Sequence, residues 1–357
     1  MAKIKFTNSD QNFYFTLKNR VENYFTENKI KPTGNLHLYF KTLVLSVSLI
    51  MCYTVLVFFT PSNAVIALLV AAFMGINIAA IGFNVMHDGA HGSYSSKKWV
   101  NDIMGYSLNV LGANVYFWKQ KHNINHHSYP NVEGMDDDID ILPLIRIHEG
   151  QKQFGIHRFQ HYYSIFIYGI AYVFWIFIND FNRYFKKKVS HLTPLRPLDT
   201  YEHFQFWITK IVYFTVFLLI PFNMVGVGKT LIAFSVMAFT AGVILSLVFQ
   251  LAHVVEETKF ITPDSDIMTI ETEWAKHQLN TTSNFSTKSA FMTWFAGGLN
   301  FQVEHHLFPK VSHVHYPQLN IIVKQTCAEY NVNYFEQPNV LKAIGSHLLH
   351  LKQVGRA

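Results

Sequence analysis

The sequence predicts an all-α integral membrane protein with four transmembrane helices arranged as two hairpins. Hydrophobic residues make up 50% of the 357-residue chain and charged residues only 15%, whereas soluble proteins carry about 25% charged residues. Four apolar runs are long enough to cross a bilayer, which takes about 20 helical residues. Several of the 19 histidines form clusters just outside these runs. These clusters indicate a site at the membrane surface.

The N-terminal segment, about residues 10–29, is expected to form an amphipathic interfacial helix. Its apolar residues recur at helical spacing, and they are Phe13, Leu17, Val21, Tyr24 and Phe25. Ser9 or Asp10 is positioned to cap its start, and the Pro32–Gly34 segment ends it. We expect the apolar stripe to lie on the bilayer or on a cytoplasmic cap of the protein.

Residues 39–60 and 64–85 are predicted to form the first transmembrane hairpin. No residue from Thr42 to Met86 is formally charged, and the segment Pro61–Asn63 divides this stretch into two runs. Each run is long enough to span the hydrocarbon core as a helix. A short extracytoplasmic turn therefore connects the two predicted spans.

Residues 206–225 and 229–251 are predicted to form the second hairpin, with a turn around Pro221, Gly226 and Gly228. A fifth apolar stretch, residues 162–179, lies between the hairpins and is rich in Tyr, Phe and Trp. If all histidine clusters share one side of the membrane, an even number of crossings must separate them. We therefore expect 162–179 to lie at the interface, where aromatic residues are favoured.

The placement of basic residues predicts that the histidine clusters face the cytoplasm. The predicted outer turns, 61–63 and 222–228, contain no Lys or Arg, whereas the opposite side is rich in both. The basic residues on that side are Lys3, Lys5, Lys18, Arg20, Lys97, Lys98, Arg183 and Lys186–Lys188. This is the positive-inside pattern. Because topology accounts for most of the net charge of +6, we do not expect a nucleic-acid partner.

Three histidine clusters and one solitary histidine are predicted to hold two metal ions. Their members are His87 and His91; His122, His126 and His127; Gln302, His305 and His306; and, alone, His253. Residues four apart share a helix face, and neutral imidazole is a good ligand for iron, copper or zinc. Eight imidazoles are too many for one ion. Cys52 and Cys327 are the only cysteines, so a cysteine metal site is excluded.

Acidic residues beside the clusters are expected to hold the remaining ring nitrogens, as occurs around most metal-binding histidines. The candidates are chiefly Asp88, Glu304 and members of the Asp136–Asp138 run, which includes Asp137. The other histidines are interpreted as structural, and they are His37, His148, His157, His161, His191, His203, His347 and His350. For His277, His313 and His315 a structural role is favoured, although their position in the C-terminal part leaves that role open.

At these clusters the chain resembles the membrane fatty acid desaturase superfamily. HDGAHGSYS, HNINHHSYPN and GGLNFQVEHHLFP are similar to its three histidine boxes. Gln302, which replaces the first histidine of the third box, is typical of the front-end subgroup. The resemblance extends from about Lys41 to Leu319, includes QLAHVVEE around His253, and is strongest to the cyanobacterial type of Δ6 acyl-lipid desaturase.

This resemblance implies four membrane spans, a non-haem centre of two iron ions, and O₂ as co-substrate. The implied reaction inserts a cis double bond between an existing one and the carboxyl end of a fatty acyl lipid or acyl-CoA. Gln302 would lie against one iron, directly or through water. Tyr116, Trp118 and Trp294 are close in sequence to the boxes and could line an acyl tunnel. The implied location is a bacterial inner membrane.

Electrons must come from a separate donor. The sequence contains no HPGG haem motif, no four-cysteine cluster motif and no GxGxxG fingerprint. The basic face would suit an acidic ferredoxin, and cytochrome b5 is the alternative. We expect a single domain over residues 1–357, with an N-terminal segment 1–38, a core 39–319 and a cytoplasmic tail 320–357.

Three other functions are compatible with part of the pattern. A hydroxylase of the same superfamily, acting on an alkane, sterol or carotenoid, could use similar ligands. A metal transporter is the non-enzymatic alternative, but it would place ionisable residues inside the spans. A structural zinc protein is the weakest alternative, because such sites are closed by four ligands and favour cysteine.

Overall fold

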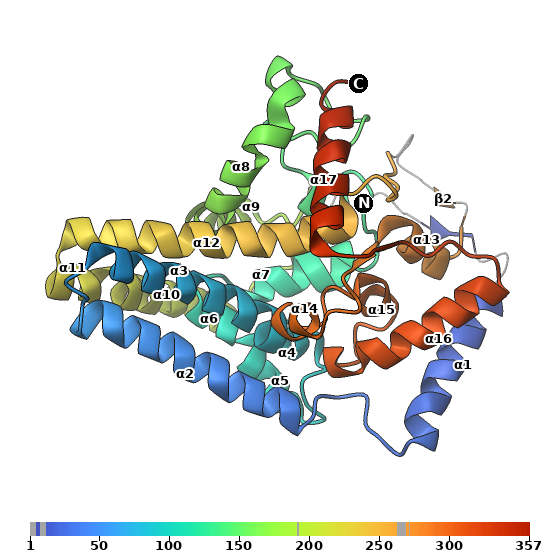
Figure 1. Cartoon of the computed structure of the whole chain (residues 1–357), viewed down its shortest axis with the longest axis horizontal. Coiled ribbons are helices and arrows are strands. Elements are labelled where there is room, and N and C mark those ends of the chain that lie inside the picture. Colours follow the sequence, from blue (N-terminus) through green and yellow to red (C-terminus); the bar gives the residue numbers. More distant parts are fainter. Residues whose placement is uncertain (1–4, 8–11, 191–192, 263–268, 271) are drawn as a thin grey trace.

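The computed structural model describes residues 5–7, 12–190, 193–262, 269–270 and 272–357 and is mostly helical (Figure 1). Within these described residues, five helical stretches are long and apolar enough to span a membrane. They are Leu36–Phe58, Ala64–His91, Gly155–Lys186, Thr200–Val225 and Val227–His253. The prediction of a helical membrane protein is confirmed at this level.

The first hairpin consists of α2 (Leu36–Phe58) and α3 (Ala64–Ile81). The Asn35 side chain caps α2 by accepting a hydrogen bond from the Leu38 amide, and Asn63 caps α3 in the same way through Val65 and Ile66. Both helices begin and end within about four residues of the positions expected from hydropathy, which is the usual uncertainty for element boundaries.

The second pair consists of α10 (Thr200–Phe214), which continues through a π-helical turn (Thr215–Leu219) into α11 (Ile220–Val225), and the long α12 (Val227–His253). Lys210 lies buried within α10, where its ammonium group donates to Asp180 at 2.8 Å and to the Gly112 and Ile176 carbonyls. This pairing makes a buried charge tolerable. It also ties α10 to the helix that contains Asp180.

That helix is the stretch expected at 162–179, and it is longer than predicted. It runs from a 3₁₀ turn (Gly155–Phe159) through α8 (Gln160–Phe174) and a π-helical turn (Trp175–Asn179) into α9 (Asp180–Lys186). In Figure 1, α8 rises steeply from α12, whereas α2, α3 and α10 run alongside α12. α8 and α12 touch at two glycines, since a Cβ on Gly242 would lie 2.5 Å from the Gly169 carbonyl oxygen.

Shorter elements form a cap at one end of the bundle (Figure 1). Its helices are α4 (His87–His91), α5 (Lys98–Gly105), α6 (Ser107–Val110), α7 (Val115–Lys119), α13 (Trp274–Thr281), α14 (Ala290–Phe295), α15 (Gln302–Leu307), α16 (Tyr316–Glu329) and α17 (Val340–Val354). Two parallel pairs of two-residue strands join distant segments, β1 (Lys5–Phe6) with β2 (Thr269–Ile270), and β3 (Asn284–Phe285) with β4 (Glu336–Gln337).

The N-terminal helix α1 (Asn12–Glu27) packs on this cap. Phe13, Leu17 and Val21 are buried in a cluster with residues of α13, α15 and α16. The apolar stripe of the helix expected at 10–29 therefore packs on the cap, which is one of the two positions expected for it. The proposed capping residues Ser9 and Asp10 lie outside the described residues. The expected tail 320–357 is folded, since it contains most of α16 and all of α17.

Candidate metal centre

His87 and His91 lie on a helical extension of α3. A π-helical turn (Gly82–Met86) leads directly into α4, so the second predicted span does continue past His87 as expected. π-turns are rare and concentrate at functional sites. The two imidazole centroids lie 4.6 Å apart. Gly89 allows α5 to approach, because a Cβ there would lie 2.5 Å from the Gly105 nitrogen.

The second cluster follows α7, whose start is capped by the Asn114 side chain. Its histidines lie on a π-helical turn (Gln120–His126) and on the residue after it. The His122 and His126 rings stack with centroids 5.2 Å apart, and the Nε2 atoms of His122 and His127 are 3.2 Å apart. The four-residue spacing therefore places two rings together, as expected, but on a wider helix.

The third cluster lies on the short helix α15, where the Asn284 side chain accepts a hydrogen bond from the Val303 amide. His305 and His306 are adjacent and face different neighbours. The His305 ring lies 4.5 Å from that of His87, and the His306 ring lies 4.7 Å from that of His253 at the end of α12. α15 thus contributes one histidine to each of two groups.

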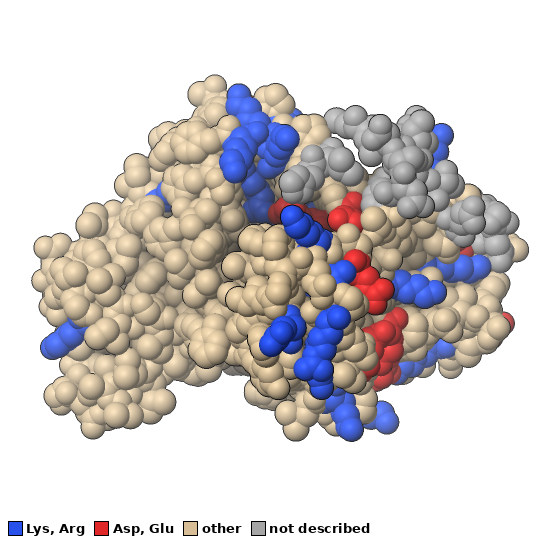
Figure 2. Space-filling model, turned by 90° about the horizontal axis from the view of Figure 1, so that it is seen from above, with Lys and Arg blue, Asp and Glu red and all other residues tan. Residues whose placement is uncertain are grey.

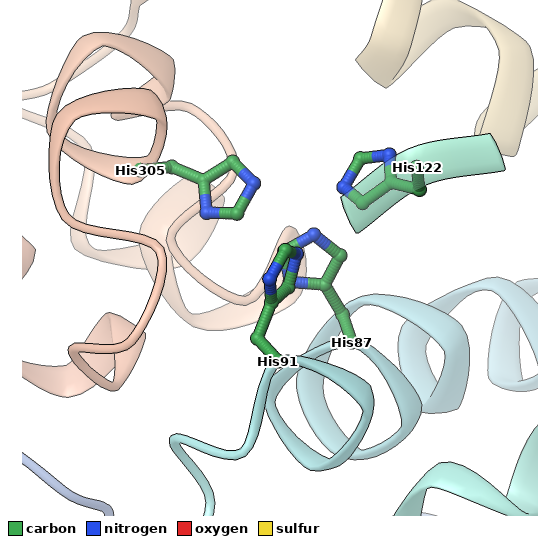
Figure 3. A group of neighbouring side chains, drawn as sticks. All are labelled: His87, His91, His122 and His305. Carbon is green, nitrogen blue, oxygen red and sulfur yellow. The ribbon is translucent and has the colours of Figure 1, made fainter. Parts of the chain in front are cut away.

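The eight predicted ligand histidines converge into overlapping groups whose potential ligand atoms lie within 4.8 Å of one another. These groups are His87, His91, His122 and His305; His126, His253 and His306; and His127, His305 and His306. Figure 3 shows the first group, with four rings from three separate segments directed toward a common space. Histidines far apart in sequence therefore meet as the spacing and topology predicted.

Most of the nitrogens that face this space have no hydrogen-bond partner among the described residues. They are buried, and they are Nε2 of His87, His91, His126, His253, His305 and His306, and Nδ1 of His127. Buried polar atoms in proteins are nearly always paired, so seven unpaired nitrogens at one place need an explanation. Coordination to metal would satisfy all of them, and the donor set of neutral imidazoles fits a transition metal.

The opposite nitrogens of four rings are held by protein groups. Nδ1 of His126 lies 2.9 Å from Asp136, that of His305 lies 3.0 Å from the Tyr316 hydroxyl, and that of His306 lies 2.8 Å from Oε1 of Gln278. Nδ1 of His253 lies 3.1 Å from the Thr281 carbonyl oxygen. Such contacts fix the ring orientation and direct Nε2 toward the centre.

The acidic residues expected in this role lie elsewhere. Asp88 faces His313 and accepts from Ser312, Glu304 accepts from the Asn284 and Asn320 amides, and Asp137 pairs with Arg183. Asp88 and Glu304 are sequence neighbours of His87 and His305, but adjacent helical positions point about 100° apart. Asp88, Glu304 and Asp137 thus contact other partners among the described residues, whereas Asp136, a member of the expected Asp136–Asp138 run, does contact a candidate ligand ring.

Burial favours the neutral form of four of the candidate ligand imidazoles. Loss of hydration lowers the pKa of His122, His127, His305 and His306 well below the ordinary value, and the neighbouring rings lower it further. His126 is the exception, because the Asp136 carboxylate raises its pKa in spite of burial. Neutral rings are the form in which histidine binds metals.

Comparison with known proteins matches residues 60–338 to the fatty acid desaturase family. The chain belongs to the fatty acid desaturase family. An acyl-lipid (8-3)-desaturase of Physcomitrium patens is 38% identical over 97% of this chain and 72% of its own length. An sn-1 linoleoyl-lipid 6-desaturase of Synechocystis is 35% identical over 99% and 98%, and the corresponding enzyme of Arthrospira platensis is 33% identical over 95% and 91%.

The family assignment makes this desaturase an oxidoreductase of lipid metabolism, of the front-end type. Its histidine groups lie at the wall of a large cavity of about 980 Å³. His87, His122, His126 and His253 line this cavity together with Gln302. Gln302 is buried and lies close enough to His253 to interact with its ring.

Of the three aromatic residues expected along the acyl tunnel, one lines the cavity of the desaturase. Trp118 does so and stacks on His122 with ring centroids 4.3 Å apart. Tyr116 instead packs under the Arg196 guanidinium, and Trp294 lies beside the Lys41 ammonium group. Neither is among the residues that line the cavity. Whether any of the three contacts an acyl chain stays a prediction.

Several other histidines make structural hydrogen bonds. His277, His315, His157 and His350 each contact a backbone carbonyl oxygen, and His347 contacts the Val254 carbonyl and the Tyr168 hydroxyl. His313 lies between the Lys41 ammonium group at 3.3 Å and the Asp88 carboxylate at 3.0 Å. This buried contact ties α2 and α4 to the segment after α15. His191 lies outside the described residues.

Proposed function

We propose that this desaturase inserts a cis double bond into a fatty acyl chain, at a Δ6-like position between an existing double bond and the carboxyl end. The observation that carries the proposal is the set of unpaired, buried imidazole nitrogens at the wall of a cavity with one polar and one apolar part. Curated relatives are named as 6-desaturases and as (8-3)-desaturases, and the cyanobacterial similarity favours the former.

The cavity suits an amphiphile. The continuous helix α8–α9 lines it along several turns, and its lining residues change from apolar to polar along the chain. They are Ile167, Tyr168, Ile170, Ala171, Tyr172, Phe174 and Trp175, followed by Asn179, Asn182, Arg183 and Lys186. A helix advances about 1.5 Å per residue, so the apolar and the polar lining residues lie at different ends of this helix. An acyl chain with its polar carrier, a lipid or CoA, fits this division.

Two iron ions are the proposed cofactor, with dioxygen as co-substrate. His87, His91, His122 and His305 would hold one ion, His126, His253 and His306 would hold the other, and His127 lies against both groups. Gln302 would complete the second site directly or through water. When bound, iron in such a site activates dioxygen for the removal of hydrogen from an unactivated methylene. The protein's part is to hold that methylene beside the histidines and to keep water away.

We further propose that α2, α3, α10–α11 and α12 cross the membrane and that α8 lies along its surface. The steep inclination of α8 to the other four supports this (Figure 1). Charged side chains are concentrated over the cap, and the opposite end of the bundle is nearly free of them (Figure 2). Lys229 is an exposed exception in the first turn of α12. The excess of Lys and Arg on the cap supports a cytoplasmic position for it, and a bacterial inner membrane is the membrane that we propose.

The chain is proposed to fold as one domain and to receive electrons from a separate protein. An acidic ferredoxin suits the basic cap, and cytochrome b5 is the alternative donor. Reconstituted activity with ferredoxin should fall as salt is raised, because screening weakens contacts between exposed charges. Activity that requires cytochrome b5 instead would identify the other donor.

Expression in a host that lacks polyunsaturated lipids, followed by feeding of linoleic acid, tests the reaction. γ-Linolenate located by mass spectrometry is the expected product. A new double bond at another position would retain the desaturase and change its regiospecificity. A hydroxylated product would contradict desaturation, since it retains oxygen. Iron analysis of the purified protein tests the cofactor independently.

A further inference from the structure

Gly82 is a buried glycine with open space where its side chain would be. It lies in the π-helical turn between α3 and α4, and all five residues of that turn are buried. A Cβ added at Gly82 would meet only Cδ2 of Leu245, at 3.5 Å, among the described residues. That distance is ordinary van der Waals contact. Gly82 therefore faces an interior cavity.

Neither packing nor backbone conformation requires glycine at this position. In the same helical stretch, a Cβ on Gly75 would lie 2.3 Å from the Met237 carbonyl oxygen, and one on Gly89 would lie 2.5 Å from the Gly105 nitrogen. Those two glycines allow backbones to touch. Gly82 has no such neighbour, and its φ of −52° is helical. A glycine inside a helix is destabilising relative to alanine, so its presence at Gly82 indicates another role.

Gly82 belongs to the wall of the cavity that contains the histidines. It lines that cavity together with Leu245 of α12, and His87 lies five residues further along the same helix. Five helical residues correspond to roughly 7 Å along the axis. The residues between them include Phe83 and Met86, which also line the cavity and are apolar. Gly82 therefore widens the apolar part of the cavity beyond the histidines.

We propose that Gly82 sets the length of acyl chain that the desaturase accepts on the methyl side of the reacting carbons. This proposal rests on the proposed function. The methyl end of the chain lies in the apolar part of the cavity, and the missing side chain at Gly82 leaves room for it to pass. A larger residue would shorten the cavity at this point without disturbing the histidines.

The test compares Gly82→Ala, Gly82→Val and Gly82→Leu in the full-length, iron-loaded enzyme. The substrates are oleoyl, palmitoleoyl and myristoleoyl lipids, which share the position of their double bond and differ only in methyl-side length. We expect a graded loss of oleoyl conversion relative to myristoleoyl, reaching about tenfold or more for Leu, since a misfit of one methylene costs 10- to 200-fold in an apolar pocket.

Gly345→Val is the matched control, because Gly345 is a helical glycine of α17 with no atom within 4 Å of its added Cβ and does not line the cavity. It should retain the wild-type substrate ratio. If Gly82→Leu has normal iron content and the wild-type ratio of oleoyl to myristoleoyl conversion, the inference is wrong. If Gly82→Leu loses iron, an unchanged ratio of oleoyl to myristoleoyl conversion in Gly82→Ala and Gly82→Val would also overturn the inference. Absence of any new double bond in the wild type would instead contradict the proposed function.

Discussion

In four of the candidate ligand histidines, one ring nitrogen contacts a protein group and the other has no hydrogen-bond partner among the described residues. In His126, His253, His305 and His306, Nδ1 contacts a protein group and Nε2 is the unpaired atom. His127 is reversed, since its Nδ1 is unpaired and its Nε2 faces His122. The orientation of the first four rings is thus set by contacts outside the centre, several of which come from segments distant in sequence.

Asp136→Asn should weaken metal binding roughly 10- to 100-fold, the usual cost of losing such an outer contact. Asp136 is buried, contacts Nδ1 of His126 and accepts a hydrogen bond from the backbone amide of Asn131. Its carboxylate therefore orients the His126 ring and the Asn131 backbone. Metal titration followed by absorbance or calorimetry measures the effect. Asp137→Asn is the control, because Asp137 pairs with Arg183 and Lys121 at the cavity. Equal metal affinity in the two variants would show that Asp136 has no special role.

Gln302→Ala should abolish turnover. Gln302 is buried, lines the cavity and lies beside His253, where its carbonyl oxygen could reach an ion or an ordered water. Product formation and iron content are measured on the same preparation. Full turnover with normal iron content would refute this assignment of Gln302.

At the scale of elements, hydropathy and turn residues were sufficient to place the long helices. Asn35, Asn63 and Gly226 mark boundaries that the apolar runs alone leave uncertain by a few residues. The π-helical turns were not predicted, because apolar periodicity does not distinguish them from α-helix over five to seven residues. They nevertheless determine which way the histidines of α4 and of the second cluster face.

The outer contacts of the histidines illustrate what the sequence could not supply. Gln278 and Thr281 are separated from His306 and His253 by more than twenty residues and meet them only in the folded cap. Gln278 and Tyr316 lie outside the three histidine boxes, and the resemblance did not indicate their role. Sequence adjacency suggested Asp88 and Glu304 instead, and helix geometry directs both away from the neighbouring ligand.

Gly242→Ala should destabilise the protein by about 1–3 kcal/mol, the usual cost of overpacking. The added methyl would lie 2.5 Å from the Gly169 carbonyl oxygen, so α8 would have to move away from α12. Thermal unfolding in detergent measures the change. Gly345→Ala adds the same methyl in open space and should leave stability unchanged or slightly higher. A wild-type unfolding temperature for Gly242→Ala would contradict the tight crossing of α8 and α12.

At the scale of the molecule, the four-span arrangement predicts that Gln153 and Arg196, on either side of α8–α9, face the same compartment. Single cysteines at these positions should be protected together from a membrane-impermeant maleimide added outside, whereas one at Ser62 should react. The native Cys52 and Cys327 are buried, which keeps the background low. Opposite labelling of Gln153→Cys and Arg196→Cys would show that α8 crosses the membrane.

Each of the three groups that consist of histidines alone contains His305, His306 or both, which are residues of α15. That helix follows all five long apolar helices in the chain. A ribosome must therefore have translated all of these helices before either site can be assembled. Iron delivery is then a late maturation event, and a truncated translation product that ends before α15 would be inserted in the membrane without the means to retain its metal.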